Sequence, residues 1–202
     1  MVSYDPESFD RPVRDYAFKD IDSPARLFDQ MSEAGGFTAS KLARAKEILG
    51  SMFEDSDKEG CVNWLSFPAA LCATGTRSFF VELIKRKLVH VVITTCGTLD
   101  HDLARTFKQY YHGDFDLDDV ALGEVGLNRL GNVVIPNECY GDILEQKVLP
   151  WLDEIGEERG SKSDSPWKGF GTVELCWAIG DRIEDDSSCL LYTSPSPRDY
   201  PG

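Results

Sequence analysis

The most constraining feature of this sequence is the apolar, β-branched run LVHVVITT at residues 88–95. It lacks the apolar/polar alternation of a half-solvated strand, so we predict a parallel strand that is buried on both faces. A second strand-like run at 61–67 precedes it, and residues 68–87 can form a helix that contains Gly75. Strand, helix and strand in this order form a βαβ unit with a right-handed crossover. The sequence therefore predicts a doubly wound α/β domain.

Local signals predict the other elements. Ser23 as N-cap, Pro24 as first residue and the pair Gly35-Gly36 delimit a helix over 25–34, and Thr38 begins a second. Thr98 is predicted to cap a helix that holds Asp100 and Asp102 in its first turn, where the helix dipole favours anions. We further expect an extended arm at 1–20, a strand at 133–135, a helix at 141–158, a loop at 160–166 and a last helix that starts near Trp167.

Composition narrows the function classes. There are 35 acidic and 21 basic residues, a net charge of −14, which disfavours nucleic-acid binding and suits a basic or polycationic partner. We find no apolar stretch near the roughly 18 residues of a membrane span and no apolar leader, so we expect a soluble, cytoplasmic protein that binds no membrane. Five of the six cysteines precede Ser188 without a CxxC pair, and we expect buried, reduced thiols.

Two segments follow the predicted strands, where open α/β sheets bind ligands. One is SFPAALCATG at 66–75, whose small residues allow close approach to the backbone; the other is TTCGTLDHD at 94–102. The second segment is the stronger candidate, although an ordinary strand-to-helix turn is an equal alternative and neither segment is GxGxxG. His90, His101 and His112 are expected on different elements, so we predict no metal site. Cys96 has no basic neighbour and is interpreted as a packing residue.

The end of the chain has a different character. The string CLLYTSPSPRD at 189–199 matches one translated reading frame of a sequencing adapter. We therefore expect residues 189–202 to be non-native, and the natural protein to continue beyond Ser188. A short disordered Pro/Ser-rich tail is the alternative.

Several long segments, in this order, resemble the N-terminal half of deoxyhypusine synthase, particularly its archaeal form. They are GGFTASKLARA at 35–45, LSFPAALCATGTR at 65–77, VITTCGTLDHDLAR at 92–105, YYHGDF at 110–115 and GLNRLGNVVIPNECYG at 126–141. The resemblance spans nearly all of residues 21–188. It implies a Rossmann-like α/β domain with a mostly parallel sheet flanked by helices, incomplete here, and a homotetramer when complete.

The resemblance also implies an activity. The family uses NAD to oxidise spermidine and transfers the aminobutyl group to a lysine of a translation factor. By position, Ala69, Ala70, Leu71, Cys72 and Ala73 form the first cofactor-contacting stretch, and Thr95, Cys96 and Gly97 the second. Asp100 and His101 stand where many relatives have two glutamates near cofactor and polyamine, so Asp100 is expected to bind substrate and His101 to bind cofactor or substrate.

Two departures from the family pattern leave alternatives open. Alanines replace a Ser/Asn-rich first stretch, and His101 replaces a carboxylate that could pair with an amine; a neutral His101 could accept a proton or hydrogen-bond a ribose hydroxyl. The family's catalytic lysine is expected beyond Ser188, so this 202-residue chain is predicted to be inactive. The alternatives are a homospermidine synthase-like transferase that acts on a small amine, and a non-catalytic partner subunit.

Overall fold

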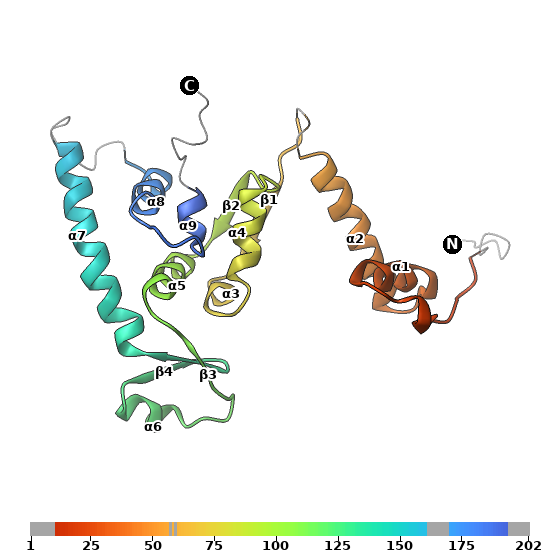
Figure 1. The fold of residues 1–202 in the computed structure, drawn as a ribbon, viewed down its shortest axis with the longest axis horizontal. Coiled ribbons are helices and arrows are strands. Elements are labelled where there is room, and N and C mark those ends of the chain that lie inside the picture. Colours follow the sequence, from red (N-terminus) through yellow and green to blue (C-terminus); the bar gives the residue numbers. More distant parts are fainter. Residues whose placement is uncertain (1–10, 57, 59, 161–169, 194–202) are drawn as a thin grey trace, which may run out of the picture. The chain divides into compact units, whose positions relative to one another are not determined.

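The computed structural model describes residues 11–56, 58, 60–160 and 170–193. They divide into two compact units, Met1–Cys61 and Val62–Gly202 (Figure 1). No local signal predicted a division at Cys61, because residues 61–67 were expected to form a strand.

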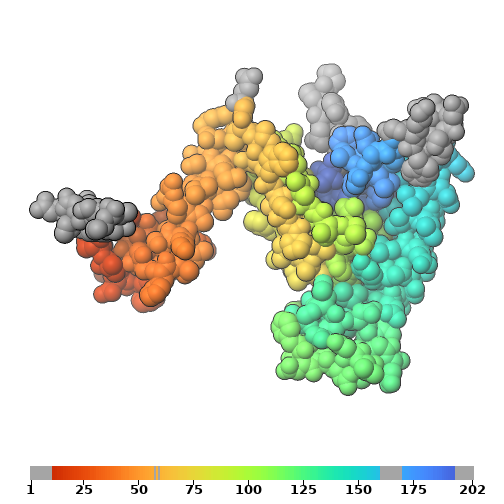
Figure 2. Space-filling model, turned by 180° about the vertical axis from the view of Figure 1, so that it is seen from behind, coloured from red at the N-terminus to blue at the C-terminus, as the bar shows by residue number. Residues whose placement is uncertain are grey.

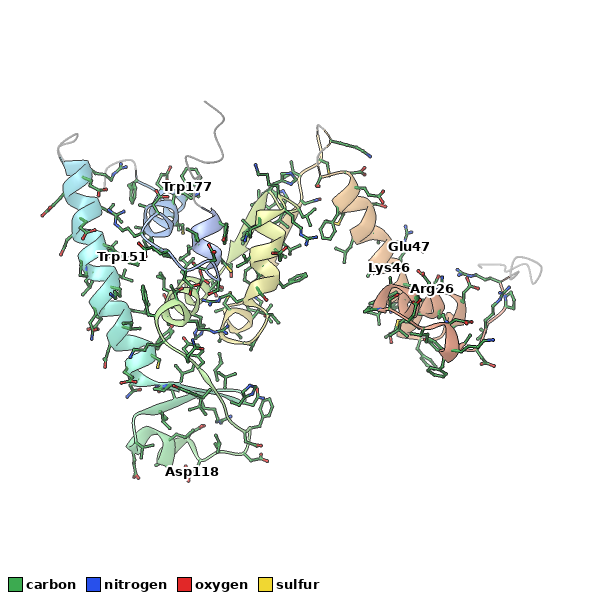
Figure 3. The ribbon with its side chains drawn as sticks, in the orientation of Figure 1. Arg26, Lys46, Glu47, Asp118, Trp151 and Trp177 are labelled. Atoms are coloured by element: carbon green, nitrogen blue, oxygen red, sulfur yellow. The ribbon has the colours of Figure 1, made fainter. Side chains whose placement is uncertain are left out.

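The first unit is a pair of helices, α1 (Pro24–Ala34) and α2 (Thr38–Glu54), preceded by the short η2 (Phe18–Asp20). The predicted signals delimit α1: the Ser23 hydroxyl accepts a hydrogen bond from the Arg26 N–H, and Gly35 ends the helix at φ +65°. Asp29 of α1 lies 2.5 Å from the Lys46 ammonium of α2 and 4.0 Å from Arg26 (Figure 3 labels both cations). Segment 11–20 lies along α1, where the Gln30 amide exchanges two hydrogen bonds with the Ala17 backbone.

The second unit contains the predicted parallel strands. Strand β1 (Trp64–Phe67) pairs in parallel with β2 (Val91–Thr94), in a register that runs from Trp64 opposite Val91 to Phe67 opposite Thr94. Helix α4 (Arg77–Lys85) lies between the two strands in the chain, and helix α5 (Cys96–Phe107) follows β2. The α/β class predicted from the sequence is therefore confirmed, with a parallel sheet and flanking helices.

One predicted helix is in fact two. Residues 68–87 form α3 (Ala70–Ala73) and α4, separated by a turn that contains Gly75. The hydroxyls of Thr74 and Thr76 both donate to the Leu71 carbonyl, at 2.9 and 2.7 Å. Side-chain hydroxyls that bind a nearby carbonyl compete with the helical hydrogen bond, which explains the interruption.

The sequence predicted that the strand within residues 88–95 is buried on both faces. For β2 this prediction is wrong in the described residues. Val92 is 37% exposed and Ile93 is 50% exposed. Among those residues the parallel sheet has two strands, and the exposed fractions of Val92 and Ile93 show that the faces of β2 are only partly covered. A strand becomes fully buried only when elements cover both faces of the sheet.

The helix after β2 also begins earlier than predicted. Thr95, not Thr98, is the N-cap residue of α5, so Asp100 and Asp102 lie beyond the first turn. The Thr98 hydroxyl is buried and lies 2.5 Å from the Thr94 hydroxyl, at the end of β2. Because the dipole acts mainly within the first turn, it does not explain these two acidic residues.

A separate antiparallel sheet contains the strand predicted at 133–135. Its order is β3 (Tyr111–His112), β5 (Val133–Pro136), β4 (Leu127–Leu130). The turn Gly131-Asn132 joins β4 to β5, and Gly131 adopts φ +61°. A two-residue turn makes its strands antiparallel neighbours, and in the described residues β5 pairs with β3 and β4 and not with the parallel strands. Helix α6 (Asp119–Glu124) precedes the hairpin, and η3 (Asn137–Cys139) follows it.

The remaining helices are α7 (Gly141–Gly160), α8 (Thr172–Gly180) and α9 (Cys189–Thr193). The predicted helix at 141–158 is confirmed as α7. Of the predicted loop at 160–166, Gly160 is instead the last residue of α7, and residues 161–166 lie outside the described residues, as does Trp167. The last predicted helix is α8, which begins at Thr172. Figure 2 shows α8 and α9, in blue, beside α7, in cyan. Within the described ranges, no helix combines the length and apolarity needed to cross a bilayer.

Two clusters of buried residues form the core of the second unit. The first lies around β1 and α4, where the Phe67 and Phe80 rings stack with centroids 3.9 Å apart. The second joins α5, α7, α8 and α9 through Leu103, Ile155, Ile179, Ile183 and Leu190. Trp151 of α7 packs against it, whereas Trp177 of α8 is 38% exposed (Figure 3).

Candidate cofactor-binding edge of the parallel strands

The two segments predicted to bind a ligand meet at one edge of the parallel pair. Phe67 and Thr94 are the last paired residues, and the Thr94 hydroxyl donates to the Phe67 carbonyl at 2.7 Å. A Cβ atom built on Gly97 would lie 2.9 Å from the Ala69 Cβ. The loops are therefore in direct contact, and the absence of a side chain at residue 97 permits this approach.

Arg105 of α5 holds the first loop in place. Its guanidinium donates to the carbonyls of Cys72, at 2.8 Å, and Thr74, at 2.5 Å. These carbonyls lie at the end of α3, where helical acceptors lack partners within the helix. One side chain thus fixes the end of α3 relative to α5.

The predicted site residues differ in accessibility. Ala70, Leu71, Thr95 and Cys96 are exposed, and Ala69, Gly97, Asp100 and His101 are partly buried. Cys72 and Ala73 are buried, backbone included, so neither is accessible to a ligand in this structure. The expectation of buried thiols holds for Cys72 and Cys139 but fails for Cys96, the exposed first residue of α5, while Cys61 and Cys176 are partly buried.

Two tyrosines that the sequence analysis left without a role contact Asp100 and His101. His101 Nδ1 lies 3.0 Å from the Tyr110 hydroxyl, with the two rings edge to face at 5.8 Å. The Tyr140 hydroxyl donates to Asp100 Oδ2 at 3.0 Å, and its ring lies 5.1 Å from the His101 ring. Both tyrosines belong to segments that resemble the family, YYHGDF and NECYG, and this resemblance is the sequence signal that could have indicated them.

Burial determines the protonation states in this group. It lowers the pKa of His101, an effect that Arg105 reinforces and Asp100 opposes. It raises the pKa of Tyr140 to about 12, with the Asp100 hydrogen bond as a further cause, and it also raises the pKa of Tyr110. At neutral pH the site therefore holds a neutral imidazole between two protonated phenols.

Asp102, next along α5, has a different role. It is fully buried and accepts hydrogen bonds from the Ser188 hydroxyl at 2.7 Å and from the backbone N–H groups of Cys189 and Leu190 at 3.0 Å each. Arg77, itself buried, donates to the Asp102 carbonyl at 2.9 Å and lies 3.4 Å from its carboxylate. Asp102 therefore fixes the start of α9 to α5 and does not face the candidate site.

Two cavities in the described residues are lined by residues other than those predicted for the site. One, of about 50 Å³, lies among Phe80, Val92, Asp102 and Leu190 and is lined by none of the predicted site residues. The other, of about 300 Å³, lies in the first unit beside α2. Ligand pockets usually measure about 300–1,000 Å³. The smaller cavity is therefore a packing gap. The candidate site is assigned from the residues at the carboxyl ends of β1 and β2 and not from a cavity.

The evenly spaced histidines do not come together. His90 directly precedes β2, His101 lies in α5 and His112 in β3. The described part of the chain contains no group of three or more His, Cys, Asp or Glu side chains arranged to hold a metal ion.

These features define an α/β protein with a candidate ligand site at the carboxyl ends of parallel strands. The family model for deoxyhypusine synthase matches residues 26–196, and the chain belongs to this family. It is 43% identical over 198 residues to a Picrophilus torridus protein named "Probable deoxyhypusine synthase", covering 97% of this chain and 60% of the relative. A Thermoplasma acidophilum protein of the same name is 42% identical over 184 residues, covering 91% and 56%.

Solved structures agree on the fold. A crystal structure named as "a putative deoxyhypusine synthase from Entamoeba histolytica" superposes with a TM-score of 0.55 at 21% identity. The match covers 90% of this chain and 60% of that one. The chain thus spans about three fifths of the proteins that it matches. The family match includes α9, and the predicted adapter origin of residues 189–202 stays a prediction.

Proposed function

We propose that this chain is the cofactor-binding part of an NAD-dependent transferase. The complete protein would take the aminobutyl group of spermidine and attach it to a lysine of a translation factor, as a cytoplasmic homotetramer. Membership of the deoxyhypusine synthase family supports the reaction class. The contact between Gly97 and Ala69 is the structural observation that carries the proposal, because it joins the two proposed cofactor-contacting segments into one edge.

The residues at this edge fit a dinucleotide. Ala70 and Leu71 of the first segment are exposed, and the Thr95 side chain does not cap the first-turn N–H groups of α5. Such N–H groups, at the positive end of a helix, suit phosphate oxygens. When bound, NAD would supply the hydride acceptor for amine oxidation. Thr95, Cys96 and Gly97 would hold it from one side and Ala69 to Ala73 from the other, with Asp100 and His101 facing cofactor or amine.

We further propose that the lysine that carries the aminobutyl group lies beyond Ser188 in the complete protein. A lysine nucleophile needs a lowered pKa and a pocket that excludes water. The hydrogen bond with Asp55 raises the pKa of Lys58, and the contact with Tyr192 raises that of Lys85, so neither side chain has the lowered pKa that a lysine nucleophile needs. We therefore expect no transfer by the 202-residue chain alone, and transfer by the product of the uninterrupted gene.

Cofactor binding is tested by protection of a thiol. Cys96 is exposed at the proposed site, so NAD should slow its alkylation in the complete protein by at least about tenfold at saturation. Cys61, in the first unit, serves as the internal control, and Cys96→Ser identifies the signal by mass spectrometry. Equal alkylation with and without NAD would overturn the placement of the cofactor.

The acceptor is tested with radiolabelled spermidine and NAD. Label on the translation-factor lysine supports the proposed reaction, whereas label only on a small amine establishes the homospermidine synthase-like alternative. If neither forms unless a full-length paralogue is added, the chain is a partner subunit and the proposal fails.

A further inference from the structure

We propose that Tyr110 is a positioning residue that holds neutral His101 with its proton on Nε2, so that His101 acts at the candidate site as a hydrogen-bond donor. The inference deepens the proposed function and rests on it for the identity of the ligand. It decides between the two roles that the sequence left open for His101, proton acceptor or hydrogen-bonding group.

Only one of the two ring nitrogens of His101 has a hydrogen-bond partner in the described residues. The Tyr110 hydroxyl lies 3.0 Å from His101 Nδ1, and within the described residues the structure gives Nε2 no hydrogen-bond partner. The edge-to-face contact of the rings and the Tyr140 ring on the other side restrict rotation of the imidazole. His101 therefore presents Nδ1 to the protein and leaves Nε2 available to a ligand.

The direction of the hydrogen bond follows from the chemistry of the two groups. A neutral imidazole has one nitrogen that donates and one that accepts, whereas a phenol can do either. An unprotonated imidazole nitrogen is a stronger base than a phenol oxygen, so the favourable arrangement is Oη–H donating to Nδ1. Burial keeps the Tyr110 phenol protonated and opposes the imidazolium. The remaining proton of His101 is then on Nε2.

This assignment limits what His101 can bind. An Nε2–H group donates to an acceptor oxygen and cannot accept a proton from an ammonium group. Its ligand at the site is therefore a hydrogen-bond acceptor, which we assign to an oxygen of the dinucleotide, on a ribose or a phosphate, and not to an ammonium group of the polyamine. Asp100, which accepts from Tyr140 and retains further lone pairs, is the group in this pair that can face a cation.

Long-range ¹H–¹⁵N correlation NMR at neutral pH measures the tautomer of His101 directly. The ¹⁵N-labelled chain has three histidines, so each ring can be compared with the other two. His90 is an internal reference, because its Nδ1 accepts from the Asn63 backbone N–H at 2.9 Å and must carry its proton on Nε2. His112 is exposed, and the described residues give its side chain no hydrogen bond, so it reports an unrestrained ring. We expect His101 to match His90; an Nδ1–H pattern, or one like that of His112, would overturn the proposal.

Substitutions test the role of the tyrosine. Tyr110→Phe should convert the His101 signal to the unrestrained pattern, whereas the matched control Tyr111→Phe, at an exposed neighbour, should leave it unchanged. If the two tautomers become equally populated, only half of the protein is competent and NAD affinity falls about twofold. An unchanged His101 signal in Tyr110→Phe would contradict a positioning role, and loss of the fold is recognised from the His90 reference.

The donor role is tested by NAD binding to the complete protein. A glutamine can place an amide N–H near the position of Nε2, so His101→Gln should retain affinity within about threefold. His101→Leu, which cannot donate, should lose about tenfold, equivalent to about 1.4 kcal/mol. Equal losses in both variants would refute the donor role. Absence of NAD binding by the unmodified protein would instead refute the proposed function, while the NMR result would still decide the role of Tyr110.

Discussion

Replacing Asp102 by asparagine should destabilise the second unit by about 3–5 kcal/mol, although the two side chains have almost the same shape. The carboxylate accepts three hydrogen bonds from the start of α9 and faces the Arg77 guanidinium, and no part of it reaches solvent. An amide has one oxygen, so it can replace one side of the carboxylate only. The Asn NH₂ group would face N–H or O–H donors on the other side.

The magnitude follows from the contacts that are lost. Oδ2 accepts from both Ser188 and Leu190, and hydrogen bonds to a charged group contribute about 1.5–3 kcal/mol each. Arg77, whose side chain is 9% exposed, would also keep its charge without a carboxylate partner. Breaking a buried ion pair costs about 3–5 kcal/mol by independent measures. Since domains are stable by about 5–15 kcal/mol, the loss is large enough to measure.

The assay is urea unfolding of the 202-residue chain, followed by tryptophan fluorescence and far-UV circular dichroism, with coincidence of the two probes as the test of two-state behaviour. Asp119→Asn is the matched control, because Arg129 binds that carboxylate at 2.7 and 2.9 Å but the side chain is 67% exposed. We expect Asp119→Asn to lower the free energy of unfolding by no more than about 1 kcal/mol.

A double-mutant cycle separates the ion pair from the hydrogen bonds. Arg77→Met removes the cation, and the combination with Asp102→Asn should be less destabilising than the two single changes together by at least about 1 kcal/mol. If the two substitutions lower the free energy of unfolding additively, and Asp102→Asn alone lowers it by less than about 1 kcal/mol, the assigned role of the buried carboxylate is refuted.

Three further predictions concern the candidate site. Gly97→Ala should weaken NAD binding at least about tenfold in the complete protein because its Cβ would meet Ala69 at 2.9 Å, whereas Gly75→Ala, with open space around it, should have no effect; equal titration curves would contradict this. NMR titration should give His101 a pKa below the ordinary value of 6.5. Because the unfolded chain then takes up this proton at a higher pH than the folded chain, the free energy of unfolding should fall as the pH decreases through 6.5, and His101→Asn should lack this contribution. At neutral pH iodoacetamide should modify Cys96 before Cys139, which is buried and whose pKa is raised by that burial; the reverse order, by mass spectrometry, would contradict the assigned exposures.

The sequence by itself determined the features whose causes are local. Ser23, Pro24 and Gly35 delimit α1 because caps and fixed φ angles act within a few residues. The β-branched run predicted β2, and its order with β1 predicted the α/β class and the edge at which the candidate segments would meet. The motifs also indicated the family. These inferences need only neighbours in the chain or the general geometry of parallel strands.

The tertiary structure decided the features that depend on distant partners. Whether β2 is covered, and which sheet receives β5, depends on elements elsewhere in the chain. Asp102 looked like a first-turn acidic residue, yet its partner Ser188 lies 86 positions away. His101 and Tyr110 are close in sequence, but their hydrogen bond requires α5 to end and the chain to turn between them. Packing free energy, summed over contacts between distant segments, selects these arrangements, and periodicity and local signals do not encode it.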